Sequence, residues 1–191
     1  THDGVPRKAD SLAFTPLTWA AQNGHEGMVK LLLKEKNINL EAQVFEWGRT
    51  ALSWATGAGY ERIAKVLLDQ GEIHAESQDW RGRTPLSHAA ASPTVEVVML
   101  FLEREGVNAE LPDNDGRTPL SHAGEEGSPE VVKLFLDRKE VDAELQNNTG
   151  RTPLSHAAEE GGAQVVKLFL ELEEVNAELQ DNRGRTPLSY A

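Results

Sequence analysis

Histidine and arginine side chains recur along this 191-residue chain at intervals of 34 residues, and their types are the ones that could do chemistry. Histidine can act as a general acid or base or bind zinc, whereas arginine binds carboxylates and phosphates through paired hydrogen bonds. The histidines are His88, His122 and His156, and the arginines are Arg49, Arg83, Arg117, Arg151 and Arg185. Because the spacing is constant, the elements that position these residues must repeat as well.

Each of these histidines follows a serine, which suggests a test for nucleophilic catalysis. On a helix, neighbours such as Ser121 and His122 point about 100° apart, so they cannot form a nucleophile and base pair. The chain also contains neither a phosphate-binding Gly-Lys-Ser/Thr loop nor a strand-turn-helix nucleophile elbow. The many glutamates are most simply a solvated surface. We therefore expect that the protein is not an enzyme and uses no cofactor.

The three histidines are also poorly spaced for a metal site. Helices packed side by side lie about 8–10 Å apart, whereas each zinc ligand lies about 2 Å from the ion. Cysteine ligands are excluded because the chain has no cysteine. We therefore expect no bound metal.

All these residues belong to one motif, which residues 116–123 show as Gly-Arg-Thr-Pro-Leu-Ser-His-Ala. Its threonine returns after a first step of 35 residues and then every 34, at Thr15, Thr50, Thr84, Thr118, Thr152 and Thr186. Such a period predicts a solenoid of helical repeats. We interpret residues 1–9 as a leader, an expression remnant or the tail of a preceding element, and 10–191 as one repeat domain. Its units are 10–44, 45–78, 79–112, 113–146, 147–180 and the partial unit 181–191.

Each unit is predicted to contain a tip followed by two helices, as the fourth unit illustrates. Residues 113–116, Asp-Asn-Asp-Gly, favour a hairpin-like turn with the glycine at positive φ. Thr118 suits the N-cap of a short first helix, and Pro119 suits its first position. Residues 131–136 are too apolar for an exposed helix, so neighbouring units must cover the second helix. We expect Leu134 to be buried there, and its replacement by alanine to cost about 2–5 kcal/mol.

The turn, the Thr-Pro-Leu helix start, the paired alanines and the Val-Val-Lys-Leu second helix together resemble the ankyrin repeat family over residues 10–191. The resemblance implies an all-α solenoid of stacked helix-turn-helix units with short β-hairpin-like tips. It also implies a non-catalytic scaffold that binds proteins. The version of the motif found here is similar to the long ankyrin arrays of filamentous fungi, which are often attached to nucleotide-binding, receptor-like proteins. We therefore expect the array to be part of a larger polypeptide.

The sequence departs from the family pattern at several places. Serine or threonine, as at Ser121, replaces the family's usual histidine, so the hydrogen bonds of that histidine are not expected. One extra residue near Val44 shifts the exit of the first unit. Pro93 occupies the position of the glycine between two helices, so the turn of the third unit should differ. The glycines at this position in other units are Gly24, Gly59, Gly127 and Gly161.

Charge and composition restrict the partners and the location. A formal net charge of −12 repels phosphate backbones, which argues against nucleic-acid binding. The sequence contains neither an apolar run long enough to span a membrane nor a cleavable leader. The lack of cysteine favours the cytoplasm. We expect a cytoplasmic monomer that binds a protein partner, and neither nucleic acid nor membrane.

In every unit the residue after the serine or threonine that follows the motif leucine has a ring in its side chain. These residues are Trp19, Trp54, His88, His122, His156 and Tyr190. It lies about 160° around the helix from the preceding leucine, which places it toward the concave side. These rings could contact a partner, because aromatic and imidazole groups suit protein interfaces. Alternatively, each ring could pack against the adjacent tip and close the stack.

The arginines and tryptophans of the tips allow two interpretations as well. The arginines could bridge neighbouring tips through carboxylates or receive acidic groups of a partner. Trp47 and Trp80 could be exposed binding residues or could fold back onto a neighbouring tip. The predicted partner-binding residues are Trp47, Trp80, Arg83, His88, Arg117, His122, Arg151 and His156.

Units four and five are identical at 24 of 34 positions, including surface positions. Recent internal duplication explains this identity without a function. The functional alternative is that near-identical units present a repeated ligand surface. A separate hypothesis makes the array an architectural spacer or sensor arm of a multidomain, receptor-like protein.

Overall fold

The structure is a computed structural model in which residues 14–126 and 128–191 are described. The interpretation of residues 1–9, the start of the first unit and the position of Gly127 between two helices lie outside the described residues. Within the described ranges the chain is all-helical and contains no strand, which confirms the predicted fold class.

Each full unit contributes a first and a second helix, followed by a loop that leads to the next tip. The first helices are α1 (Pro16–Gln22), α3 (Ala51–Gly57), α5 (Pro85–Ala90), α7 (Pro119–Glu126) and α9 (Pro153–His156). The second helices are α2 (Glu26–Leu32), α4 (Glu61–Leu68), α6 (Val95–Leu102), α8 (Pro129–Leu136) and α10 (Gly162–Leu170). A π-helical turn, η1 (Ala157–Gly161), continues α9, and a 3₁₀ helix, η2 (Pro187–Tyr190), starts the partial sixth unit.

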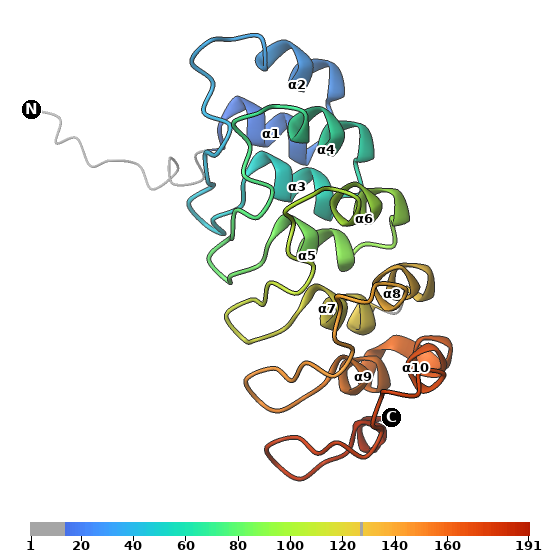
Figure 1. The fold of residues 1–191 in the computed structure, drawn as a ribbon. Coiled ribbons are helices and arrows are strands. Elements are labelled where there is room, and N and C mark those ends of the chain that lie inside the picture. The colour runs from blue at the N-terminus through green and yellow to red at the C-terminus, as the bar shows by residue number, and fades with distance from the viewer. Residues whose placement is uncertain (1–13, 127) are drawn as a thin grey trace, which may run out of the picture.

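The helices form two layers, as Figure 1 shows. The first helices stack on one another in sequence order, and the second helices stack beside them. The tips project together from one edge of the array (Figure 1). We call the surface made by the tips and the first helices the tip-side surface.

A threonine begins the first helices as predicted, and the motif serine completes the cap. Thr84 has extended backbone dihedrals, and its hydroxyl accepts a hydrogen bond from the backbone N–H of Ser87. The Ser87 hydroxyl in turn accepts from the backbone N–H of Thr84, and Thr152 and Ser155 repeat this reciprocal pair. Two backbone donors of the helix start are thereby satisfied. Serine at the position of the family's histidine therefore has a structural use.

The tips are tight turns rather than paired strands. In the fourth unit the N–H of Asp113 donates to the carbonyl of Arg117, and the N–H of Gly116 donates back to Asp113, both at 2.9 Å. Gly116 has a φ of +77°, which a side chain would disfavour. Adjacent tips are joined directly, because the N–H of Asn114 donates to the carbonyl of Arg81 at 2.9 Å.

Apolar side chains between the units form one continuous core along the array. In α8, Val131, Val132 and Phe135 are fully buried, so neighbouring units do cover the second helix. Leu134 is only partly buried, which corrects the expectation that it is a core leucine. The helix turns Phe135 toward the core, and Phe101 and Phe169 occupy the same place in their own units.

The connections between first and second helices differ among units. In the third unit Pro93 lacks the positive φ that Gly24 (+72°) and Gly59 (+73°) have at this position, and the hydroxyl oxygens of the flanking Ser92 and Thr94 lie 3.1 Å apart. In the fifth unit the extra residue of the π-helical turn moves the positive-φ glycine to Gly162, where the repeat pattern predicts Gly161. The third-unit prediction is thus confirmed, and the fifth-unit glycine is displaced by one residue.

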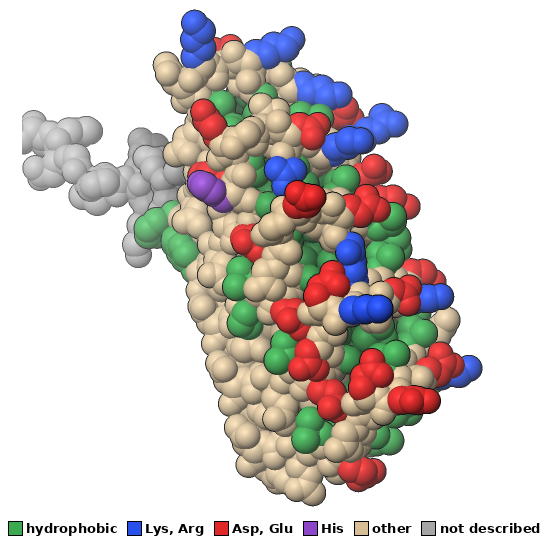
Figure 2. Space-filling view, in the orientation of Figure 1, with side chains coloured by type: hydrophobic (Ala, Val, Ile, Leu, Met, Phe, Trp, Pro, Cys, Tyr) green, Lys and Arg blue, Asp and Glu red, His purple; other side chains and the backbone are tan. Residues whose placement is uncertain are grey.

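Several glutamates join consecutive units instead of only facing solvent. The carboxylate of Glu110 accepts a hydrogen bond from the backbone N–H of Asp142 at 2.5 Å. The equivalent acceptors are Glu41, Glu76 and Glu144, and their backbone donors are His74, Asn108 and Asn176. Figure 2 shows acidic side chains along the length of the array. Part of this acidic surface therefore holds the stack together.

Candidate functional site

The motif histidines reach the tip of their own unit. The Nε2 atom of His122 lies 3.0 Å from Oδ2 of Asp113, nine residues earlier, and His88 makes the same contact with Asp79 at 2.9 Å. His122 and His156 are each only 1% exposed. Packing against a tip, one of the two alternatives for these rings, is therefore what the structure shows for them.

The carboxylates that bind these histidines also cap the tips. Oδ1 of Asp113 accepts from the backbone N–H groups of Asp115 and Arg117, both at 2.9 Å. Burial alone would raise the pKa of Asp113, but the hydrogen bonds from His122 and the backbone outweigh it and lower the pKa. Asp113 is therefore an ionised structural group at neutral pH.

His88 and His156 are kept neutral by their surroundings. Burial lowers the pKa of His88 even though the hydrogen bond to Asp79 opposes the change. In the fifth unit Asn147 replaces the aspartate, and its Nδ2 lies 3.2 Å from Nε2 of His156. Burial and the positive charges of Arg117 and Arg151 lower the pKa of His156 to about 3. A neutral, buried imidazole cannot supply charge to a binding surface.

The motif arginines have different partners in different units. Arg117 donates to Glu125 at 2.8 Å and Arg151 to Glu159 at 2.5 Å, in both cases a glutamate eight residues later. Arg83 approaches the next tip only through its Nε, 3.9 Å from Asp113. Bidentate bridging between tips is therefore not the geometry of these pairs.

Arg151 lies in a cavity of about 390 Å³ near the C-terminal end of the array, between the fifth and sixth tips. There Arg151 and Arg185 each place a guanidinium group over the ring of Tyr190, at 4.1 Å and 4.3 Å from its centroid. The Tyr190 hydroxyl donates to Asp181 and lowers the pKa of that carboxyl. The charged and aromatic groups that line this cavity are therefore already paired with one another.

The two tip tryptophans fold onto neighbouring groups and still expose much of their rings. Trp80 packs over Gly48 of the preceding tip and meets Phe45 edge to face, with ring centroids 5.6 Å apart. Trp47 packs edge to face on Trp54 at 5.7 Å. Trp80 remains 52% exposed and Trp47 43% exposed. Trp80 therefore folds back onto the neighbouring tip, as one of the two interpretations predicts, whereas Trp47 packs within its own unit.

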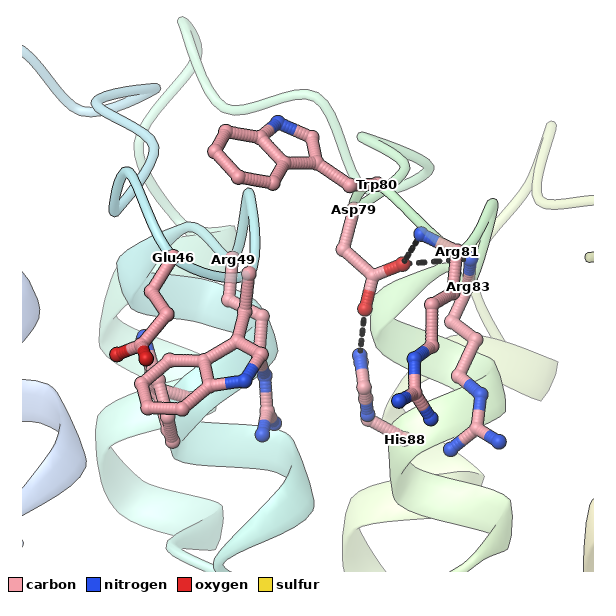
Figure 3. Close-up of a pocket in the computed structure, with 9 residues that line it drawn as sticks. Glu46, Arg49, Asp79, Trp80, Arg81, Arg83 and His88 are labelled. Carbon is pink, nitrogen blue, oxygen red and sulfur yellow. Dashed lines mark hydrogen bonds and ion pairs between the residues drawn. The ribbon is translucent and has the colours of Figure 1, made fainter.

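A cavity of about 470 Å³ lies between the second and third tips, and we call it the tip cavity. It is lined by Glu46, Trp47, Arg49, Trp54, Asp79, Trp80, Arg81, Arg83 and His88. Figure 3 shows that Arg81 and Arg83 extend side by side next to His88, with Trp80 above them. Half of the predicted partner-binding residues thus meet in one place: Trp47, Trp80, Arg83 and His88.

Arg49 is a residue of this cavity that the sequence analysis did not select. Its guanidinium carbon lies 4.1 Å from the centre of the Trp54 ring, and its Nη2 donates to the carbonyl of Ser53. Burial lowers its pKa to about 10, the charge of Asp79 opposes this change, and the group stays charged at neutral pH. The sequence does contain a signal for Arg49: Gly57 stands eight residues after it, where Arg117 and Arg151 have a glutamate.

The described residues do not suggest another kind of site. In residues 14–126 and 128–191 no cluster of three or more His, Asp or Glu side chains could hold a metal ion. No helix in the same ranges is long and apolar enough to cross a membrane.

Stacked pairs of short helices joined by tight tips define the class of helical repeat solenoids. The family profile for ankyrin repeats in three copies matches residues 4–79, 71–144 and 125–191. The chain belongs to the ankyrin repeat family. Ankyrin repeats are generally protein–protein interaction modules and are typically not enzymes. No curated protein matches the chain.

Proposed function

We propose that this chain is a non-catalytic module that binds a protein partner through its concave face and tips, with the tip cavity at the centre of the contact. The observation that carries the proposal is the meeting of Trp47, Trp54 and Trp80 with three arginines around one cavity. Tryptophan and arginine are the residue types most enriched among the side chains that dominate binding energy at protein interfaces.

The predicted residues fall into three groups. Trp47 and Trp80 expose ring area, and the side chain of Arg83 is 26% exposed, so these three can contact a partner. His88, His122 and His156 have little exposed surface and contribute by holding the tips in place. Arg117 and Arg151 can contribute through the exposed part of their ion pairs with glutamates.

The proposed setting follows from charge and composition. With a net charge of −12, the module should bind neither nucleic acid nor an anionic membrane surface. We place it in the cytoplasm, as a monomer and as part of a larger polypeptide of the kind found in fungal ankyrin arrays.

The test is a selection of peptide or small-domain ligands from a random display library on the purified chain, followed by affinity measurements on variants. Trp80→Ala should weaken a selected ligand by about 30-fold, as for a residue worth ~2 kcal/mol at an interface. Leu170→Ala, an exposed apolar residue on the last second helix, is the matched control and should change affinity less than about twofold. Equal effects of the two substitutions would contradict the proposal.

The second candidate is an architectural spacer or sensor arm. The uniform inter-unit bonds of Glu76, Glu110 and Glu144 favour it, because they couple every unit to the next in the same way. Inserting one more copy of residues 113–146 should then raise the melting temperature and lengthen the array, and the function of the parent protein should change with that length. A parent protein that tolerates Trp80→Ala but not a change of length would support the spacer over the binding module.

A further inference from the structure

We propose that the tip cavity recognises an acidic peptide segment of the partner, with a carboxylate between Arg49 and Arg83 and a neighbouring aromatic side chain against Trp47 and Trp80. This inference rests on the proposed function and names the chemistry of its partner. The overall acidity of the chain predicts a basic or mixed-charge partner surface. The arginines of the tip cavity are a local exception to that acidity.

The strongest argument comes from comparing equivalent positions in successive units. In units four and five the motif arginine pairs with a glutamate eight residues later, Glu125 near the end of α7 or Glu159 in η1. In units two and three the same position holds Gly57 or Ala91. Arg49 therefore has no glutamate partner in its own unit, and Arg83 has only the 3.9 Å approach of its Nε to Asp113.

The carboxylates near these arginines are already used. Asp79 accepts three hydrogen bonds. Its Oδ1 accepts from the backbone N–H groups of Arg81 and Arg83, and its Oδ2 accepts from His88. Glu46 lies at the rim, is exposed, and forms no ion pair with the described residues. Around the cavity the three guanidinium groups outnumber the two carboxylates, Asp79 and Glu46, so the local charge favours an external anion.

Buried donors in the cavity also lack partners. Among the described residues, the Nε atoms of Arg49 and Arg83 and the indole Nε1 of Trp54 are buried and have no hydrogen-bond acceptor. A buried donor without an acceptor is unfavourable, and a carboxylate offers several lone pairs at once. The Nε atoms of Arg117 and Arg151 are buried and unpaired in the same way, so the missing glutamate, and not the Nε atom, is what sets Arg49 and Arg83 apart.

The shape of the site favours a peptide rather than a free ion. A volume of about 470 Å³ is far larger than one carboxylate or phosphate group needs, and pockets of this size hold drug-sized ligands. Exposed faces of Trp47 and Trp80 flank the opening, and aromatic pairs add favourable contact beyond simple area burial. An aromatic residue next to an acidic one matches this combination of surfaces.

The experiment is a two-dimensional ¹⁵N NMR titration that follows the four tryptophan indole signals. The probe is the peptide Ac-Glu-Phe-Glu-Glu-NH2, and its controls are the peptides with every Glu changed to Gln or with Phe changed to Ala. The signals of Trp47, Trp54 and Trp80 should shift, whereas Trp19, which packs on His25 at 5.0 Å, should not. Both control peptides should bind at least about tenfold more weakly. Inorganic phosphate is a separate arm that reports the contribution of the anion alone.

Two variants test the assigned position directly. Ala91→Glu places a carboxylate where units four and five have one, so it should pair with Arg83 and weaken the probe about tenfold. Ala91→Gln has the same size without the charge and should leave the affinity within about twofold. Melting curves by circular dichroism confirm that both variants fold.

Three results would overturn the inference: no indole shift at millimolar probe, equal weakening by Ala91→Glu and Ala91→Gln, or inorganic phosphate binding as tightly as the peptide. None of them would refute the binding module itself. A selected ligand whose affinity falls with Trp80→Ala, but not with Ala91→Glu, would leave the module standing and reject the acidic segment.

Discussion

The Nε2–H group of His122 donates to Oδ2 of Asp113 across 3.0 Å, although the two residues lie nine positions apart and both are nearly inaccessible to solvent. Because the other carboxylate oxygen caps the tip, Asp113 links the turn to the helix that follows it. The pair therefore makes the tip and the first helix one rigid piece, and the same pairing in His88 and Asp79 forms one wall of the tip cavity.

Removing the tip carboxylate should destabilise the array. We expect Asp113→Ala to lower the free energy of unfolding by about 2–3 kcal/mol, because it leaves His122 and two backbone N–H groups without their acceptor. Asp113→Asn keeps one oxygen for the backbone, as Asn147 does in the fifth unit, and should cost only about 1 kcal/mol. Urea denaturation followed by circular dichroism measures both values. Equal losses would show that the backbone hydrogen bonds to Asp113 do not contribute to stability.

His156 should make the array sensitive to mild acid. Its pKa is lowered from 6.5 to about 3 in the folded chain, so between these values only the unfolded chain binds the proton. Stability should therefore be unaffected above pH 6.5 and should fall with decreasing pH below it, by at most about 1.4 kcal/mol per pH unit.

A single substitution separates this effect from other titrations. Asn147→Asp offers His156 a carboxylate acceptor, so it should raise the pKa of His156 and make stability between pH 6.5 and pH 4 fall less steeply. NMR titration of the imidazole signals and urea melts at several pH values provide the measurements. An unchanged pKa in this variant would mean that Asn147 does not control the imidazole.

The second helices should depend more on phenylalanine than on leucine. Phe135 is fully buried between units, so Phe135→Ala should cost about 3–5 kcal/mol. Leu134 is only partly buried, and Leu134→Ala should cost about 1–2 kcal/mol, less than the value expected for a core leucine. The comparison uses chemical denaturation of the two variants, and a larger loss for Leu134 would contradict the packing described for α8.

Gly48 should tolerate no side chain. Its φ is +69°, and a methyl group there would collide with the indole of Trp80. We expect Gly48→Ala to destabilise the chain by about 1–3 kcal/mol and to change tryptophan fluorescence. Gly27→Ala is the control, because Gly27 lies within α2 with open space around it and alanine there should stabilise the helix by about 0.5–1 kcal/mol. Similar effects at both sites would mean that Trp80 does not rest on Gly48.

The candidate site was only partly predictable from the sequence. The residue types at the tips indicated Trp47, Trp80, Arg83 and His88, and all four line the tip cavity. Arg49 was not among the predicted residues, although it belongs to the same series as Arg83. Only the contacts of Arg117 and Arg151 with their glutamates show how the earlier arginines differ.

The sequence by itself determined the period, the helix starts and the glycines of the tips, because caps and turns depend on residues within a few positions of one another. It therefore determined the ankyrin architecture as well. Only the tertiary structure decided that His122 is buried against Asp113, that Phe135 and not Leu134 occupies the core position, and that three arginines meet three tryptophans around a cavity. These features depend on side-chain directions and on contacts between successive units, which the spacing of residues along the chain does not specify.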